Sequence, residues 1–176
     1  MCRALLITVR RTLSIIGLVS ASVMSLPALA LSHEEWVMAF VRFIDWPVFP
    51  VDKTLVICQP PNAPMLELQG KQVRGLTLQV VRIGRPRDAE HCHVFSALSQ
   101  PEDEWLPWLA AFKLQPVLAV GLGPRFCELG GTICIVRQEA MAAETYQLNL
   151  DSLSRSGFKV RSQLLRPAPA GSATIN

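Results

Sequence analysis

Beyond its first thirty residues, the sequence lacks an excess of charge of either sign. The chain has 17 lysines and arginines against 14 aspartates and glutamates, but Arg3, Arg10 and Arg11 precede residue 31, which leaves 14 of each sign in residues 31–176. Proteins that bind nucleic acid concentrate positive charge to neutralise the phosphate backbone. The balanced charge excludes a basic stripe of that kind, so no nucleic-acid partner is expected.

The sequence also lacks, after residue 30, an apolar run long enough to cross a membrane, so a soluble mature protein without membrane insertion is expected. The first thirty residues differ, because three arginines precede the apolar stretch at residues 12–26 and the small-residue pattern Ala-Leu-Ala ends at Ala30. This arrangement is typical of a secretory signal peptide. We expect residues 1–30 to direct export and to be cleaved after Ala30, with an uncleaved anchor as the alternative.

The motifs of several enzyme classes are missing: the sequence contains no GxSxG, no HExxH and no P-loop. The stretch "GLGPRF" fails the dinucleotide-binding pattern because its sixth residue is Phe126. We therefore predict that Gly121 and Gly123 are turn residues. No catalytic residue and no cofactor are expected.

Only three histidines are present, and two of them flank a cysteine in "HCH". On a strand, His91 and His93 would point to the same side, where Glu90 or Asp88 could complete a metal site. Zinc sites usually show a second pair of ligands at matched spacing, which is missing here. Surface histidines are favoured, and no metal is expected.

Four cysteines remain once Cys2 leaves with the signal peptide: Cys58, Cys92, Cys127 and Cys134. An even number in an exported domain favours two disulfides, and three connectivities are possible. Pairing Cys58 with Cys92 and Cys127 with Cys134 is the most local one. Six residues separate Cys127 from Cys134, whereas the cysteines of a redox motif are usually separated by two. This spacing favours a structural bridge over a redox motif or a metal site. A thiol oxidoreductase is the enzyme alternative.

The hydrophobic pattern alternates between helix and strand periods over a length that fits one domain. It predicts an α/β fold, a mixed, mostly parallel sheet flanked by helices on both faces. Helices are expected from Ser32 to near Asp45, around Met65–Leu68, from near Glu104, and from near Asp151 to Gly157. Strands are expected at 54–58, 76–83, 92–98, 116–121, 132–137 and 145–150. The domain is expected to span 31–166, followed by a disordered tail at 167–176.

Several segments occur in the order found in the YfiR family of bacterial periplasmic proteins, which this chain resembles from Glu34 to Arg166. The most specific are "WP" at Trp46, the Gly-Gly pair before "TICIV", and "NLDSLSRSG". Ala39 replaces an asparagine that is common in the family, and "GGTICI" replaces its Gly-Gly-Met form. The resemblance implies an α/β fold, and disulfides where the four cysteines stand.

The resemblance also implies a function. Members of the family are periplasmic repressors that bind the periplasmic sensor domain of an inner-membrane diguanylate cyclase, and so lower cyclic di-GMP and biofilm formation. A peptidoglycan-associated lipoprotein of the outer membrane sequesters the repressor, and members tend to form homodimers. Such a protein needs differential affinity for two states of its target, and no chemistry of its own.

Two groups of residues are candidates for binding a ligand or partner. Trp36, Phe40 and Trp46 belong to an aromatic-rich first helix, although packing of such residues on the sheet is the alternative. Lys159 and Arg161 alternate along an extended segment, so both side chains would face an anionic ligand or an acidic partner. A solvated strand face is the alternative there. A periplasmic protein that binds an anionic metabolite is the second function considered.

Overall fold

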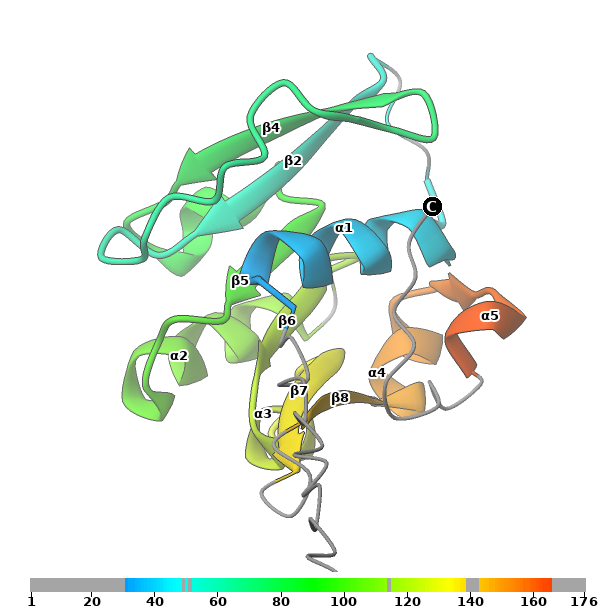
Figure 1. Cartoon of the computed structure of the whole chain (residues 1–176). Helices are drawn as coiled ribbons and strands as arrows, with labels where there is room; N and C mark the ends of the chain where they lie inside the picture. The colour runs from blue at the N-terminus through cyan, green and yellow to red at the C-terminus, as the bar shows by residue number, and fades with distance from the viewer. Residues whose placement is uncertain (1–30, 49, 51, 114, 139–142, 166–176) are drawn as a thin grey trace, which may run out of the picture.

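The computed structural model describes residues 31–48, 50, 52–113, 115–138 and 143–165, so the expected signal peptide and tail lie outside the described residues. Figure 1 shows the arrangement. The helices are α1 (His33–Phe43), the 3-10 helix η1 (Pro86–Ala89), α2 (Glu102–Phe112), α3 (Pro124–Glu128), α4 (Leu150–Arg155) and α5 (Ser162–Leu165). The strands are β1 (Ile44–Asp45), β2 (Thr54–Gln59), β3 (Gln72–Val73), β4 (Leu76–Arg82), β5 (Val94–Ala97), β6 (Leu118–Leu122), β7 (Ile133–Gln138), β8 (Ala143–Leu148) and β9 (Lys159–Val160).

Seven strands form one sheet in the order β3-β4-β2-β5-β6-β7-β8, and the five inner strands are all parallel. The edge strands β3 and β8 are antiparallel to their neighbours. The inner strands are apolar runs because both of their faces are covered, as in other parallel sheets. The prediction of a single α/β domain with a mixed, mostly parallel sheet is confirmed.

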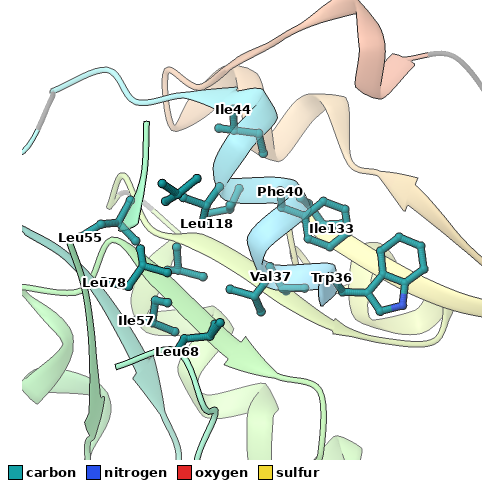
Figure 2. Close-up of a cluster of buried hydrophobic side chains, with 14 of the residues drawn as sticks. Trp36, Val37, Phe40, Ile44, Leu55, Ile57, Leu68, Leu78, Leu118 and Ile133 are labelled. Carbon is teal, nitrogen blue, oxygen red and sulfur yellow. The ribbon is translucent and has the colours of Figure 1, made fainter. Parts of the chain in front are cut away.

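Each face of the sheet carries its own hydrophobic core. On one face, Trp36, Val37 and Phe40 of α1 and Ile44 of β1 pack against side chains of β2, β4, β6 and β7 (Figure 2). Residues of α4 and α5 join this core. On the other face, α2 and α3 bury four aromatic side chains with Phe95, and the four cysteines belong to this second core. Helices therefore cover both faces, as the sequence pattern predicts.

The first helix begins where its capping box predicts. The Ser32 side chain accepts the N–H of Glu35, and the Glu35 carboxylate accepts the N–H of Ser32. The helix ends at Phe43, two residues before the predicted end, because Ile44 and Asp45 extend as β1 and pair with β9. This short two-stranded sheet fastens the end of α1 to the C-terminal part of the described chain.

Two glycines make room for one phenylalanine beneath α2. Phe126 is fully buried and meets the ring of Trp105 edge to face, with ring centroids 4.9 Å apart. A Cβ on Gly121 would lie 2.4 Å from the Phe126 ring, and a Cβ on Gly131 would lie 2.1 Å from it. Gly121 lies inside β6, so its assignment to a turn is wrong, whereas Gly123 with φ +78° does precede α3. One glycine of each motif, Gly121 in "GLG" and Gly131 in "GG", therefore serves packing.

Three further expectations about local structure are wrong. Residues 65–68 form no helix but loops and turns, in which the Gln59 side chain accepts the N–H of Leu66 and donates to the carbonyl of Pro64. The helix α2 starts at Glu102, directly after Pro101, two residues before the expected Glu104. The N-cap of α4 is Asn149 and not Asp151.

Candidate functional site

A cluster of three charged side chains lies where α1, the β3–β4 turn and β9 meet. Asp45 Oδ1 accepts hydrogen bonds from Arg74 Nη2 at 2.6 Å and from Arg161 Nη2 at 3.1 Å. Arg161 Nε also lies 3.4 Å from Asp45 Oδ2. Segments separated by more than a hundred residues are thus joined through one carboxylate. We call Asp45, Arg74 and Arg161 the arginine cluster.

Backbone geometry places each member of the cluster. Arg74 and Gly75 both have positive φ, 52° and 77°, and they form the two-residue turn between β3 and β4, as in a type I′ hairpin. The turn directs Arg74 toward α1, where Nη1 donates to the carbonyl of Ile44 at 2.9 Å. Arg161 follows β9, and its N–H donates to the carbonyl of Phe43.

The cluster keeps a surplus of positive charge. Hydrogen bonds from Arg161, and next from Arg74, hold the pKa of Asp45 below its ordinary value, so the carboxylate is ionised at neutral pH. One carboxylate faces two guanidinium groups, and the exposed Lys159 lies opposite Asp45 in the β1–β9 pairing. The side chains of Arg74 and Arg161 are 25% and 44% exposed. An anionic group can therefore reach both arginines from solvent.

The three aromatic candidates are buried. Trp36, Phe40 and Trp46 are 6%, 0% and 9% exposed. Trp36 donates from Nε1 to Glu144, and Trp36 and Phe40 both pack against the ring of Tyr146. These side chains fix the position of α1, and in this conformation they present little surface.

Trp46 directly follows Asp45 of the arginine cluster, and its side chain is buried. Its ring packs edge to face against the ring of Phe158, with the ring centroids 6.0 Å apart. The next residue, Pro47, lies against Gly157, where a Cβ would come within 3.1 Å of the Pro47 Cβ. Gly157 also has φ +74°, a conformation that glycine adopts without strain. The "WP" and "SG" segments quoted from the sequence thus meet in space and support β1 and β9.

The cysteines are paired as Cys58–Cys92 and Cys127–Cys134, each with Cα atoms 5.8 Å apart. This is the most local connectivity. All four are at most 9% exposed and lie in the core beneath α2. Thiol catalysis requires an accessible sulfur, so this arrangement fits a structural bridge better than a redox centre.

The "HCH" segment lies just before β5, at the edge of the sheet where the parallel strands begin. His91 is exposed and pairs with Glu90 at 3.2 Å, whereas His93 is half-buried. Among the described residues no group of three or more histidine, cysteine or acidic side chains is arranged to hold a metal ion. Within the part of the chain that the structure describes, no helix is long and apolar enough to cross a membrane.

The sequence pattern predicts Lys159 and Arg161 as binding residues and does not single out Asp45 and Arg74, which the structure places beside Arg161. Asp45 stands directly before the "WP" pair of the family resemblance, and Arg74 directly before a glycine, but neither position indicates a binding role by itself. Their meeting depends on tertiary structure and cannot be read from spacing.

Comparison with known proteins gives one family match. A family model described as YfiR/HmsC-like matches residues 32–168. A comparison with curated proteins finds no match. The matched range contains both disulfides and all three residues of the arginine cluster.

Proposed function

The chain belongs to the YfiR/HmsC-like family, and from this premise we propose that it is a periplasmic negative regulator. Its target is the periplasmic sensor domain of an inner-membrane diguanylate cyclase, which it holds in the inactive state. Binding lowers cyclic di-GMP and biofilm formation. A peptidoglycan-associated lipoprotein of the outer membrane relieves the repression, and the repressor forms a homodimer. The family match across residues 32–168 is the observation that carries this proposal.

The signal-like first thirty residues support a periplasmic location, with cleavage after Ala30. Two buried disulfides also fit an oxidising compartment. A repressor of this kind acts by binding one state of its target more tightly than the other. To move the target from 1% to 99% inactive, it must prefer the inactive state by about 10⁴-fold.

We propose that the arginine cluster, with Lys159, is the part of the surface that contacts the cyclase. Its uncompensated positive charge suits an acidic patch on the partner, and arginine is enriched among residues that dominate binding energy. Trp46 follows Asp45 in the chain and packs against Phe158, whereas Trp36 and Phe40 are buried residues of α1. Their contribution is to hold β1 and α1 in the binding geometry.

The test is direct binding of the purified mature chain to the periplasmic domain of the diguanylate cyclase, under oxidising conditions. Replacing both Lys159 and Arg161 with glutamate reverses charge on the proposed surface, so affinity is expected to fall by about tenfold or more. Arg87→Glu, in η1, is the matched control, because it reverses an exposed charge elsewhere and is expected to leave affinity unchanged. Failure of the unmodified pair to associate would contradict the proposal.

A second function, binding of a small anionic metabolite, rests on the same two arginines sharing one carboxylate. Guanidinium groups bind carboxylates and phosphates through paired hydrogen bonds. This alternative predicts a rise in melting temperature with anionic metabolites, which the Lys159 and Arg161 double substitution abolishes. A thermal shift without any association with the cyclase domain would favour it over repression.

A further inference from the structure

The side chain of His93 completes a backbone ladder at the start of β5. The N–H of His93 donates to the carbonyl of Val56 at 2.9 Å, and His93 Nδ1 accepts the N–H of Val56 at 3.0 Å. A ring nitrogen that accepts a hydrogen bond carries no proton, so the neutral ring holds its proton on Nε2. The imidazole thus takes the role that a backbone oxygen has elsewhere in the ladder.

The surroundings of His93 keep it neutral at pH 7. It lines a surface hollow of about 470 Å³, together with three other charged or titratable side chains: Asp52, Glu90 and His91. The other lining residues carry no titratable group. Burial lowers the pKa of His93 below its ordinary 6.5, and the carboxylate of Asp52 opposes this effect more weakly. Asp52 Oδ1 is held by the N–H of Thr54, and Glu90 is paired with His91.

We propose that His93 is an acid-sensitive switch: protonation of Nδ1 breaks its bond to Val56 and opens the start of the β2–β5 pairing. A protonated imidazole is a donor at both nitrogens. Two donors, the Nδ1–H and the Val56 N–H, then face each other. Cys92 directly precedes His93, so the opening occurs beside the Cys58–Cys92 disulfide. This disulfide keeps the two strands tethered.

The direction of the pH effect follows from the lowered pKa. The unfolded chain binds the His93 proton near pH 6.5, and the folded chain binds it only at lower pH. The stabilisation from neutral His93 is therefore complete above pH 6.5. It is lost as the pH falls from 6.5 toward the folded-state pKa, with up to about a tenfold loss in the folding equilibrium constant per pH unit.

The same hollow connects the switch to the arginine cluster. Trp46 also lines this hollow, and Trp46 directly follows Asp45 in the chain. Opening of the strand start loosens the packing of Trp46 and hence of β1. On the premise of the proposed function, acid in the periplasm lowers the affinity of the repressor for the cyclase.

The experiment compares the wild-type chain with His93→Asn, whose side-chain oxygen accepts a hydrogen bond and cannot be protonated in this range. The matched control is His91→Asn, because His91 is a histidine of the same segment whose side chain is 85% exposed. Amide hydrogen exchange of Val56, corrected for the intrinsic pH dependence, is measured at pH 7.5 and 5.0. Wild type and His91→Asn are expected to lose at least about tenfold protection in acid, whereas His93→Asn keeps it. Unchanged protection in the wild type, or an equal loss in His93→Asn, overturns the switch.

A wild-type titration covers the case in which His93→Asn does not fold. The ring resonances of His93, followed by NMR, are expected to titrate with a midpoint below 6.5, together with the loss of Val56 protection. A midpoint at or above 6.5, or a titration that leaves Val56 protected, overturns the switch.

Binding to the periplasmic domain of the cyclase is measured separately at the two pH values. Weaker binding in acid for wild type, and not for His93→Asn, supports the regulatory role. Equal binding at both pH values overturns that role. If no binding occurs at either pH, the proposed function fails, while the exchange data still decide the switch.

Discussion

The clearest residue-scale constraint is the contact between Gly131 and Phe126. Alanine at position 131 places a Cβ 2.1 Å from the Phe126 ring and 2.7 Å from its carbonyl oxygen, so both backbone and ring must move. We expect Gly131→Ala to lower the free energy of unfolding by about 1–3 kcal/mol, the usual cost of overpacking a core. Urea denaturation measures this change.

Gly84→Ala is the matched control for that substitution. A Cβ on Gly84 would have no neighbour within 4 Å, and the glycine does not have a positive φ. Its free energy of unfolding is expected to stay within about 0.5 kcal/mol of wild type. An equal loss for both variants would mean that Phe126 does not restrict position 131.

At the scale of elements, α4 depends on Asn149. Its Oδ1 accepts the N–H of Ser152 at 3.0 Å, while its Nδ2 donates to the carbonyl of Cys127 at 2.7 Å. One side chain thus caps α4 and ties it to α3. Asn149→Ala is expected to cost about 1–2 kcal/mol, measured by chemical denaturation.

The comparison for Asn149 is Asp151→Ala. Asp151 pairs with Arg155, and its side chain is 76% exposed. Exposed ion pairs contribute little, so a loss of about 0.5 kcal/mol or less is expected. A larger loss of unfolding free energy for Asp151→Ala than for Asn149→Ala would mean that Asp151, and not Asn149, caps α4.

The sequence predicts the sheet better than the ends of its helices. Buried parallel strands are recognisable because residues such as those of β2 and β6 are apolar on both faces. Cap positions fail because Asn149 and Asp151 are chemically similar and only tertiary contacts distinguish them. The short strands β1 and β9 have no pattern of their own, since two residues carry no period. Lys159 and Arg161 are candidates from sequence because they alternate along one segment, whereas Arg74 joins them only through the tertiary structure.

On the scale of the whole molecule, the two disulfides close loops of very different length. They are separated by 34 and 7 positions in sequence. In the chain-entropy model the longer loop stabilises by about 4 kcal/mol and the shorter by about 2.5 kcal/mol. Replacing Cys58 and Cys92 with alanine is therefore expected to cost more than replacing Cys127 and Cys134. Urea denaturation of the two double variants, without reductant, measures the difference; an equal or reversed order contradicts it.

The two bridges also follow one another along the chain without overlap, since 58–92 ends before 127–134 begins. When a chain enters an oxidising compartment with its N-terminus first, its cysteines appear there in sequence order. The second cysteine of each bridge is then the next one to appear after the first. Simple oxidation in order of appearance then yields the native pairs, because no crossed pairing has to be undone by thiol exchange. Correct maturation of this protein should therefore require an oxidant but no disulfide isomerase.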